Sequence, residues 1–359
     1  MSQFIFPAIE IILGIILLFA GGELFIQGAI YLSLILGIPQ IVIGLTVVSL
    51  GTSSPELLVS LNSIFRGSDS LAVSNVIGSN IFNVLVVLGI SSLITPLKVK
   101  SRIVRRDVPL LIAISCGVWA MSSTGLLTWQ AGIFLIFCLT LNTIWEINTI
   151  KENKEDTKNA EPAIEESQFN DSSNLNIILK LISGILLLSF GSNTLVNGSQ
   201  SLATLLGVNE IIIGLTIVAT GTSLPELVTS IIAAFKGKTD LAIGNVIGSN
   251  LLNQLLILGS CSIFSGLEGL TIDQSLIKVD LPFMVLTTLA CLPIFRTKGK
   301  ITRVEGFILL NLYILYIIDK FLFLNGFSNI YALRVCIFIY FTLFTVLLFA
   351  KERLKISRR

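Results

Sequence analysis

The chain of 359 residues has no histidine and few charged side chains. Charged residues make up 13% of it and hydrophobic residues 53%, whereas a soluble domain carries roughly 25% charged residues. So little charge excludes an ordinary soluble domain, because most side chains must face lipid or apolar neighbours. The absence of histidine also removes the usual partner of a catalytic serine and a common zinc ligand.

The sequence also has few cysteines, and their positions suggest no chemistry. All five lie scattered in apolar runs, where a thiol behaves as a small hydrophobic side chain. We therefore assign them to packing rather than to a metal site: they are Cys116, Cys138, Cys261, Cys291 and Cys336.

Long uncharged runs dominate what is present. Only helices and closed barrels satisfy their own backbone in lipid, and a helix needs about 20 apolar residues to cross it. The runs are continuous rather than alternating, so the sequence predicts an all-α multi-pass membrane protein. Eleven spans are expected, near 5–35, 40–64, 71–94, 108–123, 129–148, 176–205, 211–235, 241–264, 279–295, 304–323 and 330–350.

The basic residues predict the topology. With the N-terminus outside, 20 of the 24 lysines and arginines fall in cytoplasmic segments, as the positive-inside bias requires. The remaining four, Arg66, Lys278, Lys320 and Arg334, fall outside. We expect an integral protein of the cell (inner) membrane with a cytoplasmic C-terminus.

The chain contains one block twice. Residues 51–89 align without a gap onto 221–259 at a constant offset of 170, with 21 of 39 positions identical. Five spans separate the matching helices, and because five is odd the second copy must point the opposite way. An inverted repeat interrupted by Gly and Pro is typical of a secondary transporter, with its site near the membrane midplane.

This arrangement predicts two inverted five-helix repeats followed by one extra C-terminal helix. The expected divisions are a first repeat (1–150, with block 40–94), an acidic cytoplasmic linker (151–174), a second repeat (175–324, with block 210–264), and the extra helix with a basic tail (325–359).

Each block places one carboxylate deep inside a span. Glu56 and Glu226 lie about 16 residues from the start of their spans, and no lysine or arginine lies in the same stretches. A charge at this depth costs roughly 2.5–3.5 kcal/mol or more and marks a functional site. Such a carboxylate either protonates or binds a cation.

A proline precedes each carboxylate. Pro55 and Pro225 lack an N–H, so the helix bends and a backbone carbonyl loses its partner. Free carbonyls at this depth are tolerated where they line a cavity or bind an ion. The same turns add the hydroxyl oxygens of Thr52, Ser53, Thr222 and Ser223.

The next helix of each block carries a polar stripe at intervals of four residues: Asn75, Ser79 and Asn83, then Asn245, Ser249 and Asn253. Such residues also serve close packing between membrane helices. Beside a repeated Glu–Pro bend, an ion-ligand role is favoured for Ser79, Asn83, Ser249 and Asn253.

These ligands suit calcium, which takes six to eight oxygens in flexible geometry, whereas magnesium keeps its waters. Two glutamates would neutralise its charge. The same oxygens could hold sodium ions that compete for the carboxylates, and mutually exclusive occupancy of one site, opened to each side in turn, is exchange.

The paired G-T-S-x-P-E and N-V-I-G-S-N-x-x-N blocks resemble the alpha-repeats of the cation/calcium exchanger superfamily, in its sodium/calcium exchanger branch. The resemblance covers roughly 5–323 and implies ten helices in two inverted fives, with the first and sixth helices sliding across the core. It implies ion ligation by Glu56 and Glu226. Further oxygens are implied from Thr52, Ser53, Thr222, Ser223, Ser79 and Ser249, carbonyls from Ser49 and Ala219, and flanking positions for Asn83 and Asn253.

Two departures bear on function. Some relatives, including potassium-dependent exchangers, carry Asp at the position of Asn253, so two asparagines argue against potassium dependence. The span 330–350 lies outside the ten-helix core.

The sequence thus favours a sodium/calcium antiporter that is not an enzyme and uses no cofactor. A proton/calcium exchanger remains the alternative, because the same carboxylates could carry protons, and so does a potassium-dependent sodium/calcium exchanger. A channel and an intramembrane protease fit less well, since the blocks are inverted and no matched Asp pair lies within the spans. The expected partners are calcium, sodium and the lipid bilayer; nucleic acid is not expected, and the sequence is compatible with a monomer.

Overall fold

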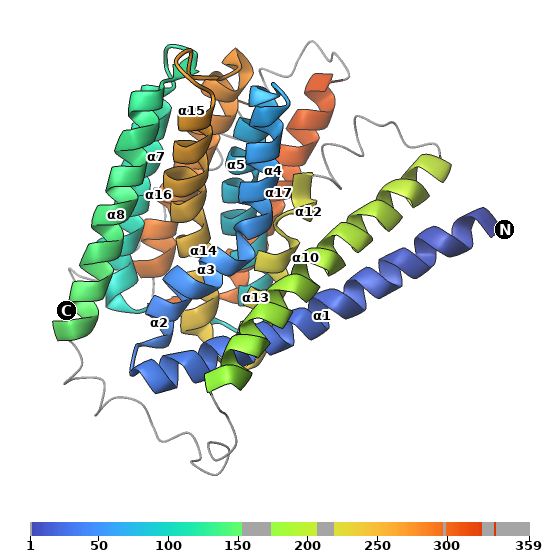
Figure 1. The fold of residues 1–359 in the computed structure, drawn as a ribbon, viewed down its shortest axis with the longest axis vertical. Helices are drawn as coiled ribbons and strands as arrows, with labels where there is room; N and C mark the ends of the chain where they lie inside the picture. Colours follow the sequence, from blue (N-terminus) through green and yellow to red (C-terminus); the bar gives the residue numbers. More distant parts are fainter. Residues whose placement is uncertain (1, 153–173, 207–218, 297–298, 325–333, 335–359) are drawn as a thin grey trace.

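The computed structural model describes residues 2–152, 174–206, 219–296, 299–324 and 334 (Figure 1). Within these ranges the chain is mostly helical, which confirms the predicted class. The linker 151–174, the first part of span 211–235 and the span 330–350 lie mostly outside the described residues, so these predictions stay untested.

The helices of the N-terminal half are α1 (Ser2–Leu36), α2 (Gln40–Ile43), η1 (Gly44–Val48), α3 (Ser49–Thr52), α4 (Ser54–Phe65), α5 (Asp69–Phe82), η2 (Asn83–Val87), α6 (Leu88–Ile94), η3 (Ile103–Asp107), α7 (Val108–Met121) and α8 (Trp129–Glu152), where η denotes a π-helical stretch. Those of the C-terminal half are α10 (Asn174–Leu205), α12 (Ala219–Gly221), α13 (Leu224–Phe235), α14 (Thr239–Leu252), η6 (Asn253–Leu258), α15 (Gly259–Phe264), η7 (Leu276–Asp280), α16 (Leu281–Arg296) and α17 (Arg303–Leu324). The short strands are β1 (Leu97–Lys98), β2 (Leu126–Leu127), β3 (Leu270–Thr271) and β4 (Lys300–Ile301).

Six helices of the described chain are long and apolar enough to cross a membrane: Phe4–Leu36, Asp69–Ile94, Trp129–Asn148, Leu175–Leu205, Thr239–Phe264 and Leu276–Arg296. The bent pair Gln40–Thr52 and Ser54–Phe65 would add a seventh. Other predicted spans correspond to helices that do not meet this test; α7 and α13, for instance, have 14 and 12 residues. The molecule is an integral membrane protein, and eleven spans remain a prediction.

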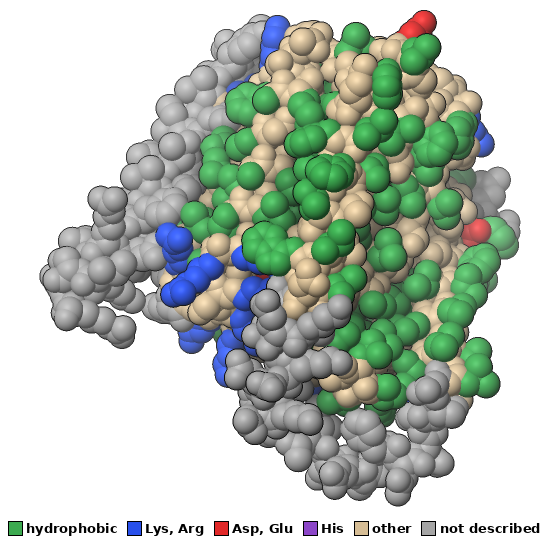
Figure 2. Space-filling view, turned by 60° about the vertical axis from the view of Figure 1, so that its left-hand side comes forward, with side chains coloured by type: hydrophobic (Ala, Val, Ile, Leu, Met, Phe, Trp, Pro, Cys, Tyr) green, Lys and Arg blue, Asp and Glu red, His purple; other side chains and the backbone are tan. Residues whose placement is uncertain are grey.

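Burial divides the helices into a core and a periphery. The apolar windows of Asp69–Ile94 and Thr239–Phe264 are 78% and 89% buried, whereas those of α1, α8 and α10 are at most 28% buried. Large apolar side chains such as Phe6 and Ile12 on α1 are more than half exposed. Figure 2 shows hydrophobic side chains over much of one face, as expected of a surface that meets lipid.

The long helices α1 and α10 lie side by side and tilt away from the other helices (Figure 1). A Cβ added to Gly21 would lie 2.8 Å from the nitrogen of Leu188, and one added to Gly191 would lie 2.7 Å from the nitrogen of Leu18. These reciprocal contacts show that the two helices run antiparallel. Glycines spaced by seven residues let the backbones meet: Gly14, Gly21 and Gly28 on α1, and Gly184, Gly191 and Gly198 on α10.

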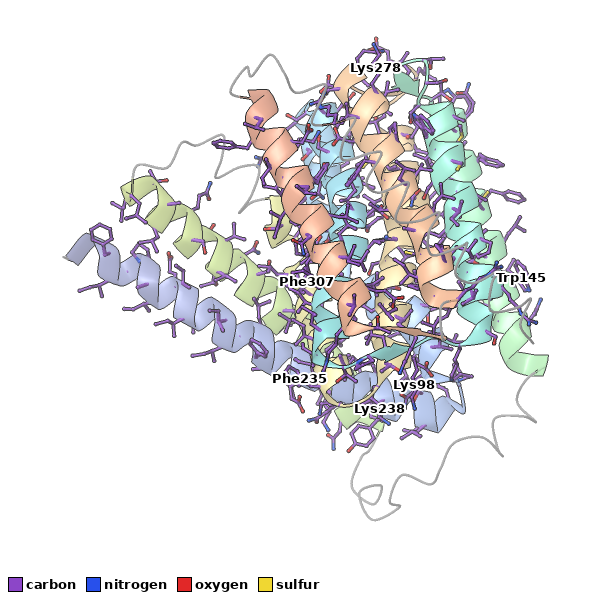
Figure 3. The ribbon with its side chains drawn as sticks, turned by 180° about the vertical axis from the view of Figure 1, so that it is seen from behind. Lys98, Trp145, Phe235, Lys238, Lys278 and Phe307 are labelled. Carbon is purple, nitrogen blue, oxygen red and sulfur yellow. The ribbon has the colours of Figure 1, made fainter. Side chains whose placement is uncertain are left out.

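Short strand pairs join the two halves. β1 pairs antiparallel with β4, and β2 pairs antiparallel with β3. Figure 3 places Lys98 and Lys238 at one end of the helix bundle and Lys278 at the opposite end. This separation agrees with the sides to which the sequence assigns these three lysines.

A buried ion-pair cluster lies near the end of α8. Glu146, 3% exposed, accepts hydrogen bonds from the guanidinium groups of Arg102 and Arg106. The Arg106 guanidinium also lies 4.1 Å from the ring centre of Trp145, and the Asp107 carboxylate lies 3.8 Å from Arg106. The cluster connects η3 and its preceding residue Arg102 to α8.

Candidate cation site

The predicted bend in the first block is present. The segment Gln40–Thr52 meets α4 at an angle of 44°, with Ser53 at the break. Pro55 lies in the first turn of α4, where the missing N–H costs no helical hydrogen bond. In the same way Pro225 lies in the first turn of α13. The prolines therefore begin new helices at these breaks.

The two predicted carboxylates occupy the first turns of these new helices. Glu56 and Glu226 are both fully buried. A helix N-terminus favours a negative charge, because its first N–H groups have no partner within the helix. The backbone thus supplies part of the compensation that a missing lysine or arginine would otherwise provide.

Each carboxylate accepts a hydrogen bond from the other half of the chain. Ser223 Oγ donates to Glu56 Oε1 at 3.1 Å, and Ser53 Oγ donates to Glu226 Oε1 at 3.0 Å. The serine of each bend thus binds the glutamate of the other bend, so the two carboxylates lie together and repel each other when both are ionised. No lysine or arginine in the described chain forms a salt bridge with either of them. A cation between them would relieve the repulsion.

The threonines of the two bends also reach across the halves. Thr52 Oγ1 donates to Asn245 Oδ1 at 3.1 Å, and Thr222 Oγ1 donates to Asn75 Oδ1 at 3.2 Å. Both asparagines are buried, and each donates its own amide to a neighbouring serine at 3.0 Å. The sequence did not assign Asn75 and Asn245 to the ligand set, and here they hold the threonines in place.

The remaining residues of the polar stripes are Ser79, Ser249, Asn83 and Asn253, and all four are fully buried. Asn83 begins η2, which packs against α13, and Asn253 begins η6, which packs against α4. Several of the buried oxygens lack a hydrogen-bond partner among the described residues: Glu56 Oε2, Glu226 Oε2, Ser79 Oγ, Ser249 Oγ, Asn83 Oδ1 and Asn253 Oδ1.

The two positions expected to offer carbonyls differ. The Ser49 carbonyl accepts the Ser53 N–H at 2.9 Å and the Thr52 hydroxyl at 3.3 Å, so it already has two donors. In the other half, the Ser223 N–H donates to the Thr220 carbonyl at 3.2 Å, one residue beyond Ala219. The backbone carbonyls of Ser49 and Ala219 were predicted to play the same role, but the hydrogen bonds around these two positions differ.

Ser192 on α10 was missed by the sequence reasoning. Its hydroxyl donates to the carbonyl of Gly221, the last residue of α12 before the break at which α13 begins. The matching position on α1 is Gly22, which has no hydroxyl to offer. Because no repeated pattern marks Ser192, only the packing of α10 against α12 reveals it.

The site combines two carboxylates with neutral hydroxyl and amide oxygens. Within the described chain no group of three or more His, Cys, Asp or Glu side chains could hold a metal ion. A cation here would therefore rely on the two glutamates for charge and on neutral oxygens to complete its shell. This composition suits a hard cation such as calcium or sodium.

Comparison with known proteins agrees with this chemistry. The family model described as sodium/calcium exchanger protein matches residues 7–146 and 176–322. A putative antiporter, CaxA, of Alkalimonas amylolytica is 36% identical over 86% of this chain and 96% of its own length. The sodium/calcium exchanger MaX1 of Methanosarcina acetivorans is 29% identical over 87% of this chain and 97% of its own.

A solved structure shares the fold. The sodium-calcium exchanger NCX_Mj, soaked with sodium and calcium, superposes with a TM-score of 0.74 at 28% identity, over 87% of this chain and 98% of that one. Fold and site together define an integral membrane transporter of the cation-exchanging class. The chain belongs to the sodium/calcium exchanger family, within the cation/calcium exchanger superfamily.

Proposed function

We propose that this protein is a secondary active antiporter that exchanges sodium for calcium by alternating access at one site near the membrane midplane. The proposed ion ligands are Glu56, Glu226, Thr52, Ser53, Thr222, Ser223, Ser79 and Ser249, with Asn83 and Asn253 flanking them and carbonyls from Ser49 and Ala219.

One observation carries this proposal. Both glutamates are fully buried, each has one carboxylate oxygen without a partner, and no basic side chain of the described chain pairs with them. An uncompensated buried charge costs several kcal/mol. A bound cation removes this cost, whereas an empty site must attract ions or protons.

Alternating access follows from the proposed inverted repeats. When two halves have the same sequence pattern and opposite orientation, exchanging their conformations converts an outward-open site into an inward-open one. The matched hydrogen bonds between Ser53 and Glu226 and between Ser223 and Glu56 support this equivalence. Relatives named as sodium/calcium exchangers support the choice of ions.

The test uses the full chain in sealed vesicles loaded with sodium. Glu56→Gln and Glu226→Gln each keep the shape of the side chain and remove one of the two charges. We expect calcium uptake to fall at least about 100-fold in either variant, because two charge units of calcium would face one carboxylate. Glu268→Gln, at an exposed position, is the matched control and should transport as the parent does.

The same vesicles identify the coupling ion. An outward sodium gradient should drive calcium inward, while a pH gradient in sodium-free medium should drive little. Acid should inhibit transport, because protons compete for the same carboxylates. Calcium movement that follows the pH gradient without sodium would favour the proton/calcium exchanger, and full activity in either glutamine variant would refute the assigned site.

A further inference from the structure

The hydrogen bonds around the site occur in pairs related by the offset of 170 residues. Three such pairs agree within 0.1 Å: Ser53–Glu226 with Ser223–Glu56, Thr52–Asn245 with Thr222–Asn75, and Asn75–Ser60 with Asn245–Ser230. This agreement provides a rule. A bond made in one half predicts its counterpart in the other, and a missing counterpart needs a local cause.

The rule fails at the two asparagines that flank the site. Asn83 Nδ2 donates to Asn250 Oδ1 at 3.1 Å, so the counterpart would be a bond from Asn253 Nδ2 to Asn80 Oδ1. That bond is absent: among the described residues, neither Asn253 Oδ1 nor Asn253 Nδ2 has a hydrogen-bond partner. The two amides therefore differ, although both are fully buried.

A single side chain lies at the acceptors of the missing bonds. Gln254 Nε2 donates to Asn80 Oδ1 at 3.4 Å and to the Asn250 carbonyl at 3.3 Å. The repeat predicts a bond to each of these two acceptors. Asn80 Oδ1 is the expected acceptor of Asn253 Nδ2. The Asn250 carbonyl is the expected acceptor of Asn80 Nδ2, because in the other half Asn250 Nδ2 donates to the Asn80 carbonyl. The position matching Gln254 in the other half is Val84, which has no donor.

Backbone carbonyls determine the orientation of these amides. Asn80 Nδ2 donates to the Val76 carbonyl, so its oxygen must face Gln254. Asn250 Nδ2 donates to the Asn80 carbonyl, so its oxygen must face Asn83. Asn83 therefore turns its NH₂ group toward Asn250 and leaves its oxygen for other partners, as an ion ligand requires.

We propose that Gln254 is a positioning residue that leaves Asn253 free to rotate, by occupying the acceptor that would otherwise orient it. The N-terminal half then offers the ion a fixed amide oxygen at Asn83, and the C-terminal half offers a mobile amide at Asn253. This asymmetry weakens calcium binding, because a side chain that must be ordered on binding contributes less than one already in place. The inference rests on the proposed function for the identity of the ion.

The test replaces Gln254 with valine, the residue at the matching position 84 of the N-terminal half. Gln254→Val frees Asn80 Oδ1 for Asn253, and Gln254→Met does so while keeping the side-chain volume. We expect the dissociation constant for calcium, measured by calorimetry on the purified full chain without sodium, to fall about twofold to tenfold in both variants. Val84→Gln is the converse variant: its amide competes with Asn83 for Asn250, so binding should weaken.

The double variant Val84→Gln with Gln254→Val separates this role from simple packing. In the double variant the amide without a partner is Asn83 instead of Asn253, so the dissociation constant for calcium should return close to that of the parent. If the two substitutions only disturbed packing, their effects would add and the stability of the protein would fall. A calcium affinity equal to or weaker than that of the parent in both Gln254→Val and Gln254→Met would overturn the inference.

A structure of Gln254→Val distinguishes the inference from the proposed function. We expect Asn253 Nδ2 within hydrogen-bond distance of Asn80 Oδ1 in this variant and not in the parent. If that bond forms but the parent exchanges no calcium, the proposed function fails and the positioning role stands. If the parent exchanges calcium but the bond does not form, the positioning role fails alone.

Discussion

The ion-pair cluster at Glu146 allows a stability prediction worked from the structure. Its members, Arg102, Arg106, Asp107 and Glu146, carry two positive and two negative charges and are largely buried. Glu146→Gln keeps an oxygen that can accept a hydrogen bond but leaves the cluster with one net positive charge. The variant therefore isolates the contribution of charge from that of shape.

The expected loss is large for a single substitution. Two unit charges 4 Å apart interact by about 4 kcal/mol at an effective dielectric constant of 20, and Glu146 contacts two arginines. Breaking a buried pair by removing one partner costs roughly 3–5 kcal/mol, because the remaining charge stays buried. We expect a destabilisation of about 3 kcal/mol, since the side chain of Arg102 is 21% exposed and water screens part of the loss.

The assay is thermal unfolding of the purified protein in detergent, followed by the loss of its monodisperse form. Glu146→Gln should unfold at a clearly lower temperature than the parent, and the exposed control Glu268→Gln should not. The double variant Glu146→Met with Arg106→Met removes both charges of one pair and should recover much of the stability. An unfolding temperature for Glu146→Gln equal to that of the parent would refute the argument.

Three further predictions test topology and packing. In a background without native cysteines, Lys300→Cys should react with an impermeant thiol reagent only from the cytoplasmic face, and Glu268→Cys only from the opposite face. Reaction of both cysteines from the same face would contradict the predicted topology. Gly191→Ala should separate α1 from α10 and reduce folded yield, because its Cβ would lie 2.7 Å from a backbone nitrogen, while Gly117→Ala, with open space around it, should not. Ser192→Ala should lower unfolding stability by about 1–3 kcal/mol, because a buried carbonyl loses its donor; an unchanged unfolding temperature would mean that another donor replaces it.

The sequence predicts the membrane class and the helices well for a physical reason. Uncharged apolar runs of about 20 residues are stable across a lipid bilayer, and because these runs are continuous rather than alternating, their backbone forms helices rather than a barrel. Spans predicted at 176–205 and 241–264 correspond to α10 (Asn174–Leu205) and to α14–α15 (Thr239–Phe264). The bend at Ser53 was predictable as well, because a proline cannot continue a helix without loss and is best placed in the first turn of a new one.

Burial of the glutamates was also predictable, because a carboxylate within an apolar run of this length cannot reach water. The partners of these carboxylates were not. Ser223 and Glu56 are separated by 167 residues, and nothing in their local spacing says that one donates to the other. Cross-half bonds of this kind depend on how two helices are placed against each other.

By itself, then, the sequence determined which residues are too polar for their surroundings and that they occur in two matched sets. Tertiary structure alone decided which oxygens are left for an ion and which are used by the protein. Asn83 and Asn253 have the same local sequence position, yet only Asn83 has its amide oriented by a neighbour. The reason is that Gln254 and Asn253 compete for one acceptor, Asn80 Oδ1, which accepts few hydrogen bonds at once. Which of the two donors reaches it depends on contacts between helices that only folding brings together.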